Sequence, residues 1–367
     1  MLHLVNTALL ERVDYFFRAI TPQDKVCIIH DTDPDGICSA VIVAKGIERL
    51  RGRTIELHLP IDKKNYGITK GMLAQLRKKK ITKLITCDFS PEQYLKGLRA
   101  AAKNRDVLVI DHHKIYADTD KLPALFYKPQ LFMEGKAQQY CTAKLAYDSL
   151  SRVVDVSDLD WMAVSASIAD IATAPWMDWI RLVYRKYDLV LTDNLFETAL
   201  GEVATIISSV EVYDTLLCGK SFRTMYDAKS YQDVLGAPLA RYKHIIDKEI
   251  GKHVQLFERK KETHGELLLY KLTSRYRIHS VLSTILGLDH PHNTIVIINT
   301  SKPFISVSAR RNDCKLGVNT LLENATKGFQ GSNAGGHIPA AGGGFPRKYL
   351  NTFKKRVVKV HQKRKYE

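Results

Sequence analysis

The sequence predicts an α/β protein with a parallel sheet in its N-terminal part, a helical connector and a smaller α/β part at the C-terminus. Two observations support this prediction. Apolar strand patterns alternate with helical patterns through the first 170 or so residues, which is typical of strands joined by crossover helices. Strand patterns are then absent over about 186–262 and return from His264. We therefore predict three segments, 1–185, 186–262 and 263–367.

The N-terminal segment is expected to contain four buried strands with helices between them. The strand at 25–30 is apolar at almost every position, which favours burial on both faces. Pro91 is typical of the first position of a helix, with Ser90 as its N-cap. The expected strands are 25–30, 54–59, 83–87 and 106–110, and the expected helices are 6–20, 36–50, 71–80, 138–153 and 159–173.

The rest of the chain is expected to be helical first and mixed afterwards. Two helices, 196–217 and 239–261, are expected in the connector. The C-terminal segment is expected to contain strands at 266–272, 294–298 and 304–307, helices near 280–286 and 318–327, and a basic helix over 347–367. These patterns predict a second, smaller α/β domain.

Acidic and histidine residues directly follow three of the four N-terminal strands. They are Asp31, Asp33 and Asp35 after the first, Asp88 after the third, and Asp111, His112 and His113 after the fourth. Right-handed crossovers place these strand ends at one edge of the sheet, so the side chains are expected to converge. Asp170 lies within a small, apolar run, where a carboxylate is costly unless it is paired or bound to a cation. Carboxylates with imidazole suit a divalent cation such as Mn²⁺; a solvated acidic turn that caps the next helix remains the alternative for 31–36 alone.

Charge and composition indicate the kind of partner and compartment. The net charge of +16 favours an anionic partner, most plausibly nucleic acid, with general solubility as the alternative. The six cysteines form no CxxC pair, which is typical of reduced thiols inside the cell. No apolar run reaches membrane-spanning length, and the N-terminus lacks the features of a secretion signal. A cytoplasmic protein that does not enter a membrane is therefore expected.

Two features of the C-terminal segment are typical of anion binding. The glycine-rich stretch 335–344 lacks Walker A and dinucleotide-binding spacing, but its backbone amides would let an anion approach closely, and His337 adds a donor. Arg310 follows an apolar strand, where a guanidinium could grip a phosphate. The alternatives are a flexible loop for the glycines and a surface ion pair for Arg310. The basic stretches 77–80, 259–261 and 354–356 indicate nucleic-acid contact only as a group, since each alone is typical of a solvated face.

Taken together, these motifs resemble the DHH phosphoesterase superfamily. Asp31-Thr32-Asp33-Pro34-Asp35-Gly36, Asp88, Asp111-His112-His113 and Asp170 resemble the four motifs of its catalytic domain. Ser308-Ala309-Arg310 and Gly335-Gly336-His337-Ile338-Pro339-Ala340-Ala341-Gly342 resemble its DHH-associated C-terminal domain. The first motif is more similar to archaeal and bacterial RecJ-like nucleases and oligonucleotide-degrading relatives than to the pyrophosphatases. The chain has no room for the additional nucleic-acid-binding domain of bacterial RecJ, so processive digestion of long DNA is not expected.

The resemblance implies a site for two Mn²⁺ (or Mg²⁺) ions and a set of residue roles. The implied metal ligands are Asp31, Asp33, Asp35, Asp88, His112 and Asp170, with Asp88 as the bridge. The implied catalytic residues are His113, which would contact the scissile phosphate or protonate the leaving oxygen, and Asp111. The implied substrate-binding residues are Ser308, Arg310, Gly335, Gly336 and His337, which would hold the phosphate of the terminal nucleotide.

The expected activity is hydrolysis of single-stranded DNA or RNA, or of short oligonucleotides, from an end to release mononucleotides. One alternative is a small-molecule phosphoesterase acting on a cyclic dinucleotide or adenosine bisphosphate. The other is a catalytically silent subunit of a replication complex with the same fold. Besides nucleic acid, the resemblance leaves DNA replication or repair proteins and a second copy of the chain as partners.

Overall fold

The computed structural model describes residues 6–62, 66–135, 137–336 and 338–363. The chain divides into two compact units, Met1–Lys243 and His244–Glu367, called here the first and second unit. The long helix α11 (Ala240–Lys260) contains the boundary between them. The helices that precede α11 belong to the first unit. The division of the chain at 185 and 262 that was predicted from the sequence stays a prediction. Among the described residues, no helix is both long and apolar enough to cross a membrane.

The first unit is built on a parallel sheet, as predicted, but the sheet has five strands rather than the four expected, because the strand Leu125–Tyr127 was not predicted. Its strand order is β2 (Leu57–Pro60), β1 (Val26–His30), β3 (Lys83–Cys87), β4 (Asp106–Ile110) and β5 (Leu125–Tyr127), and all neighbours are parallel. All five residues of β1 are buried. The strand order reverses direction between β1 and β3, and in such sheets ligands bind at the carboxyl ends next to that reversal.

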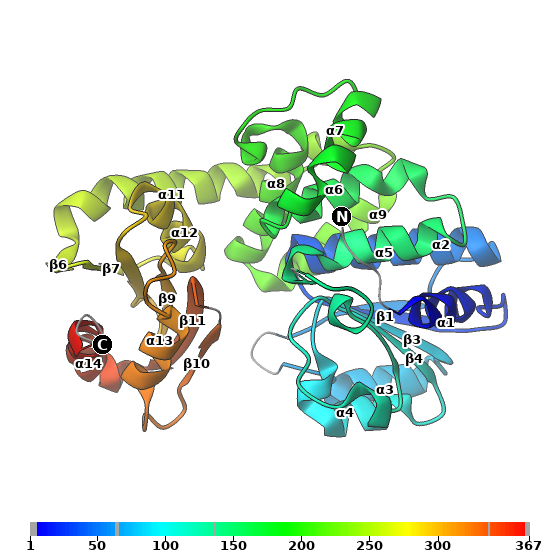
Figure 1. Cartoon of the computed structure of the whole chain (residues 1–367), viewed down its shortest axis with the longest axis horizontal. Helices are drawn as coiled ribbons and strands as arrows, with labels where there is room; N and C mark the ends of the chain where they lie inside the picture. Colours follow the sequence, from blue (N-terminus) through cyan, green and yellow to red (C-terminus); the bar gives the residue numbers. More distant parts are fainter. Residues whose placement is uncertain (1–5, 63–65, 136, 337, 364–367) are drawn as a thin grey trace. The chain divides into compact units, whose positions relative to one another are not determined.

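Helices cover both faces of this sheet. Figure 1 shows α2 (Pro34–Arg51) and α5 (Thr142–Ser151) on one face and α3 (Lys70–Lys78) and α4 (Leu95–Ala102) on the other. Ile28 belongs to the core on the first face and Ile29 to the core on the second, because successive side chains of a strand point to opposite sides. The remaining helices are α1 (Thr7–Arg18), α6 (Asp160–Ala169), α7 (Met177–Lys186), α8 (Ala199–Tyr213), α9 (Cys218–Asp227) and α10 (Tyr231–Leu235).

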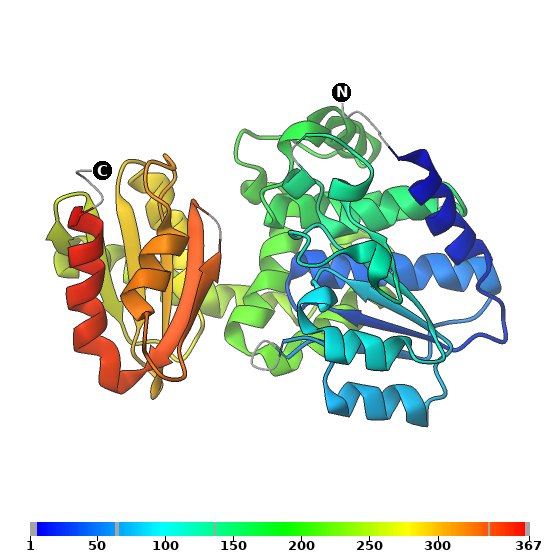
Figure 2. The ribbon, with the colours of Figure 1, turned by 60° about the horizontal axis from the view of Figure 1, so that its bottom comes forward.

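The second unit is a mixed sheet with helices packed on it. Its order is β10 (Asn333–Gly336), β11 (Ala340–Pro346), β9 (Phe304–Arg310), β8 (Thr294–Asn299), β7 (Leu267–Leu272) and β6 (Glu262–His264). Only β7 and β8 are parallel; the other neighbours are antiparallel. Besides α11, its helices are α12 (His279–Asp289), α13 (Val318–Thr326) and α14 (Leu350–Lys363). Figure 2 shows α13 and α14 against the sheet, where Leu322 and Phe353 join Val307 in one core.

The structure excludes one alternative and corrects two local expectations. The glycine-rich stretch contributes to the paired strands β10 and β11, so the alternative of a flexible loop does not hold, because backbone pairing with β9 orders glycines that carry no side-chain pattern. Arg310 is the last residue of β9 and does not follow the strand. Helix α6 ends at Ala169, so Asp170 caps it instead of lying inside it.

Candidate metal centre

The predicted metal ligands come together at the carboxyl edge of the first sheet. The structure forms three groups in which one ligand atom from each residue lies within 4.8 Å of the others: Asp31, Asp33 and Asp88; Asp35, His112 and Asp170; and Asp88, His112 and His113. Asp88 and His112 each belong to two groups. The three groups therefore overlap, and residues far apart in the sequence form one cluster.

Asp35 is held by the beginning of a helix that lies far away in the sequence. Its Oδ2 accepts a hydrogen bond from the amide of Thr142 and its Oδ1 one from the amide of Ala143, both at 2.7 Å. The residue at the N-cap of α5, Cys141, makes no side-chain capping bond, so Asp35 takes that part. The positive end of the α5 dipole faces the carboxylate. These contacts fix the orientation of Asp35, and each oxygen retains a second lone pair for a cation.

Asp88 lies at the centre of the cluster in a strained backbone conformation. Its φ angle is 65°, in the left-handed region that is uncommon outside glycine. Its Oδ1 accepts a hydrogen bond from Thr142 Oγ1 at 3.0 Å and lies 3.6 Å from His112 Nε2. Burial, together with the charges of Asp35 and Asp33, raises the pKa of Asp88 well above its usual range. A bound cation would offset this repulsion, so the donor set and its electrostatics fit a divalent metal.

The two adjacent histidines face different partners. His112 is buried, and its Nε2 lies 3.7 Å from Asp170 Oδ2 and 4.0 Å from Asp35 Oδ2. The His113 side chain is 38% exposed and its Nδ1 lies 2.7 Å from Asp111 Oδ1. Burial alone would lower the pKa of His113, but the hydrogen bond with Asp111 raises it to about 9. His112 therefore has the position of a ligand, whereas His113 lies in the same cluster with its Nδ1 engaged by Asp111.

A buried lysine, Lys128, stabilises the loop that carries Asp111 and His113. The Nζ of Lys128 lies 2.8 Å from Asp111 Oδ2 and 2.5 Å from Glu92 Oε1, and it donates a hydrogen bond to the carbonyl oxygen of His113 at 3.3 Å. The side chains of Lys128, Glu92 and Asp111 are all 0% exposed. Burial would raise the pKa of Asp111, but the bond from His113 and the charge of Lys128 hold it well below its usual range. The network fixes the carboxylate that orients His113.

Sequence reasoning missed or misassigned three members of this surrounding shell. Ser90 was expected to cap the helix after it, but the short 3₁₀ turn Pro91–Tyr94 has no side-chain cap, and Ser90 Oγ donates to Asp111 Oδ2 at 2.9 Å. Lys128 stands next to a short strand that the pattern did not indicate. Thr142 was placed inside a helix expected from 138, whereas α5 begins there. Of these three residues, only Lys128 left a sign in the sequence, because it is a charged residue within the apolar run 124–133.

Asp170 lies at the open side of the cluster. It is the C-cap of α6, and its side chain is 33% exposed. Partial burial and the charges of Asp35 and Asp33 raise the pKa of its carboxyl group well above the usual range. The expectation of a carboxylate inside an apolar helix is therefore wrong in position, but Asp170 still reaches His112.

The substrate-binding residues expected in the C-terminal segment lie in the second unit. Arg310 pairs with Ala340 of β11 and Ile295 of β8. It forms no ion pair with a described residue, and its buried Nε has no hydrogen-bond partner among the described residues. Burial lowers the pKa of Arg310. An anion would satisfy such a group, which favours the phosphate interpretation over a surface ion pair.

The other residues of that set surround the same part of the sheet. Ser308 Oγ shares a hydrogen bond of 2.8 Å with Ser283 Oγ of α12, so its hydroxyl is already engaged within the unit. Gly335 and Gly336 lie on β10, and Gly336 has a φ angle of 137°, which a side chain would strain. His337 lies outside the described residues.

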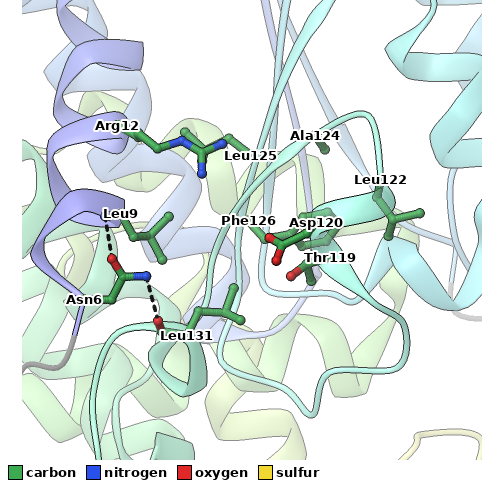
Figure 3. A pocket seen from close by; sticks show the side chains of 10 residues that line it. All are labelled: Asn6, Leu9, Arg12, Thr119, Asp120, Leu122, Ala124, Leu125, Phe126 and Leu131. Atoms are coloured by element: carbon green, nitrogen blue, oxygen red, sulfur yellow. Dashed lines mark hydrogen bonds between the residues drawn. The ribbon is translucent and has the colours of Figure 1, made fainter.

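A separate pocket of about 330 Å³ lies between α1 and the segment 119–131 (Figure 3). Apolar side chains such as Leu9, Leu125 and Phe126 line it together with Arg12 and Asp120. None of the residues of the metal centre lines this pocket, so it is a distinct feature of the first unit.

The comparisons with known proteins identify the class to which this site belongs. The model of the DHH family N-terminal domain matches residues 25–174, which run from β1 to just past Asp170. The match places this part of the chain, residues 25–174, in the DHH family, and the matched residues include every predicted metal ligand. No curated protein sequence shows significant similarity to the chain.

Solved structures share the fold at low sequence identity. RecJ from Thermus thermophilus with Mn²⁺ matches with a TM-score of 0.74 and 16% identity over 99% of this chain, which spans only 56% of that protein. Exonuclease RecJ bound to manganese matches with a TM-score of 0.68 and 17% identity, over 96% of this chain and 94% of that protein. Cdc45 from Entamoeba histolytica matches with a TM-score of 0.58 and 10% identity, over 97% of this chain and 99% of that protein. A pGpG-specific phosphodiesterase from Vibrio cholerae matches with a TM-score of 0.52 and 12% identity, over 92% of this chain and 98% of that protein. The chain therefore has a RecJ-like fold, and family and fold together support a phosphoesterase or nuclease.

Proposed function

We propose that the protein is an Mn²⁺-dependent phosphodiesterase that hydrolyses single-stranded DNA or RNA, or short oligonucleotides, from an end and releases mononucleotides. The observation that carries the proposal is the overlap of three ligand groups around Asp88 and His112. Closely spaced carboxylates, with raised pKa values at Asp88 and Asp170, are unfavourable unless a cation neutralises them.

The arrangement of the groups supports two adjacent cation positions. Asp31, Asp33 and Asp88 would hold one ion. Asp35, His112 and Asp170 would hold the second, with Asp88 shared between them. Oxygen-rich donor sets favour Mn²⁺ or Mg²⁺ over Zn²⁺. When bound, such a pair of ions neutralises the phosphate and lowers the pKa of a water molecule.

The remaining residues of the loop would act on the substrate phosphate. Asp111 occupies Nδ1 of His113 and is itself fixed by Lys128 and Ser90. The ring orientation is thereby set, and Nε2 is the donor that remains for the scissile phosphate or the leaving oxygen. His113 would be the catalytic donor and Asp111 the group that orients it.

In the second unit, Arg310 would hold the phosphate of the terminal nucleotide. The proposal is supported by its half-buried guanidinium with an unsatisfied Nε. Ser308, the amides of Gly335 and Gly336, and His337 complete the proposed phosphate grip. Charge-assisted bonds of this kind position a substrate as well as bind it.

Two alternatives remain distinct from this function. The fold shared with a pGpG-specific phosphodiesterase favours a dinucleotide substrate, whereas the net charge of +16 favours a polymer. The fold shared with Cdc45 favours a silent subunit of a replication complex, whereas the complete ligand set favours an enzyme.

End-labelled DNA and RNA of two to about thirty nucleotides, incubated with Mn²⁺, would test the proposal. Successive mononucleotides released from one end of single strands longer than two nucleotides are expected. Cleavage of dinucleotides alone would favour the small-molecule substrate. Complete inactivity with Mn²⁺ and with Mg²⁺ on every length would favour the silent subunit and would contradict the proposal.

A further inference from the structure

Helix α6 ends in a turn that requires a left-handed residue, and that residue is an isoleucine. Ile171 has a φ angle of 54°. Its amide donates to the carbonyl oxygen of Ile168 at 3.1 Å, and the amide of Ala172 donates to that of Ser167 at 2.9 Å. This pair of bonds defines the Schellman motif, in which glycine normally occupies the position of Ile171. The sequence therefore carries an unfavourable residue at the turn directly after Asp170.

The strain at this position is unusual within the protein. The described non-glycine residues with positive φ are Lys80, Asp88, Asn104, Ile171, Asp188 and Cys314, and Ile171 is the β-branched member of this set. A β-branched side chain in the left-handed region is a genuine outlier. Asp188 ends α7 with the same pair of bonds, through the carbonyl oxygens of Arg185 and Tyr184. Aspartate tolerates that conformation far better, so Asp188 provides a matched comparison.

Burial does not explain the isoleucine. The residue is 56% exposed and belongs to no core of the first unit, so it gains little from packing. Its neighbour Asp170 lies in the metal centre, 3.7 Å from His112. A strained and exposed apolar residue thus directly follows a proposed metal ligand in the sequence. Strained residues that persist without a packing reason are concentrated at functional sites.

We infer that Ile171 is a specificity-determining residue, whose side chain packs against the base of the nucleotide that is cleaved. The inference rests on the proposed function and names a substrate contact of the same site. A base presents an apolar face, and covering the exposed part of Ile171 with it removes apolar surface from water. Glycine would make the same turn without strain but would provide no such contact. The strain is therefore retained for substrate recognition.

Three variants separate contact from structure. Ile171→Gly should lower kcat/KM on a short oligonucleotide about five- to twenty-fold, mainly through KM, as expected for loss of a half-exposed aliphatic contact. Its melting temperature should rise by about 2–4 °C, because the turn is relieved of strain. Ile171→Leu keeps the apolar bulk without branching, so its kcat/KM should stay within about two-fold of wild type. Asp188→Gly, the matched control, should leave the kinetics unchanged.

A substrate lacking the base of the cleaved nucleotide identifies what the side chain touches. On this abasic oligonucleotide, wild type and Ile171→Gly should have the same kcat/KM. Equal activity of the two proteins on the intact oligonucleotide, or an equal loss on both substrates, would overturn the inference while leaving the proposed function standing. A wild-type protein that hydrolyses no oligonucleotide would overturn the proposed function and this assignment with it.

Discussion

Replacing Lys128 by methionine is expected to destabilise the first unit strongly. The side chains of Lys128, Glu92 and Asp111 are 0% exposed, and the ammonium group lies 2.5 Å from one carboxylate and 2.8 Å from the other. Methionine has a similar shape but no charge, so two buried carboxylates would lose their shared cation. Breaking a buried ion pair by removing one partner typically costs about 3–5 kcal/mol.

This loss is measurable in the first unit alone. The three tryptophans, Trp161, Trp176 and Trp179, all lie in the first unit, so their fluorescence reports its unfolding. For a domain of this size, each kcal/mol changes the melting temperature by about 2–4 °C, which predicts a decrease of about 6–20 °C for Lys128→Met. Urea titration of the metal-free protein gives the corresponding free energy of unfolding.

A double variant separates lost charge from lost packing. Adding Glu92→Met to Lys128→Met removes one of the two buried carboxylates that have lost the lysine, so stability should partly recover, with a coupling energy above about 1.5 kcal/mol. The exposed pair of Lys121 and Asp118 provides the control: Lys121→Met should leave the unfolding midpoint unchanged. A loss below about 1 kcal/mol for Lys128→Met would refute the reasoning.

Three further outcomes are expected. Asp170→Asn should fold as well as wild type without metal but show a smaller rise in melting temperature with Mn²⁺, because a ligand is lost; equal rises measured by calorimetry would exclude Asp170 from the site. Arg310→Ala should lower kcat/KM about ten- to two-hundred-fold in steady-state kinetics, since a charge-assisted contact is lost; unchanged kcat and KM would show that Arg310 does not touch substrate. Binding of single strands to His112→Ala should weaken with salt, with a log–log slope of about −0.7 per phosphate contacted, and a slope that stops growing beyond two nucleotides would favour a dinucleotide substrate.

The parts of the fold that could be predicted are those encoded locally. Strands β1, β3 and β4 are short apolar runs, and the chemistry-bearing residues follow each of them directly. Parallel connection rules then predict convergence of their ends without knowledge of any long-range contact. The predicted ligands Asp31, Asp88 and His112 do come together in the structure.

The parts that could not be predicted depend on partners distant in the sequence. Thr142 meets Asp35 across 107 positions, and Lys128 meets Glu92 across 36, so neither contact leaves a local pattern. The end of α6 was misplaced because Ile171 occupies a turn position at which glycine would have signalled the end of the helix. Long-range contacts, and a turn that lacks the usual glycine, therefore could not be predicted from local sequence patterns.

The Mn²⁺ stoichiometry of the purified protein, measured together with oligonucleotide hydrolysis in the same samples, tests the central claim most directly. Wild type is expected to bind two Mn²⁺ per chain and to lose hydrolysis in excess chelator, because the cluster around Asp88 holds the ions. Asp88→Asn should lose both properties while remaining folded without metal, and Asp188→Asn should lose neither. A wild-type protein that binds no Mn²⁺, or that hydrolyses oligonucleotides equally well in excess chelator, would contradict the account.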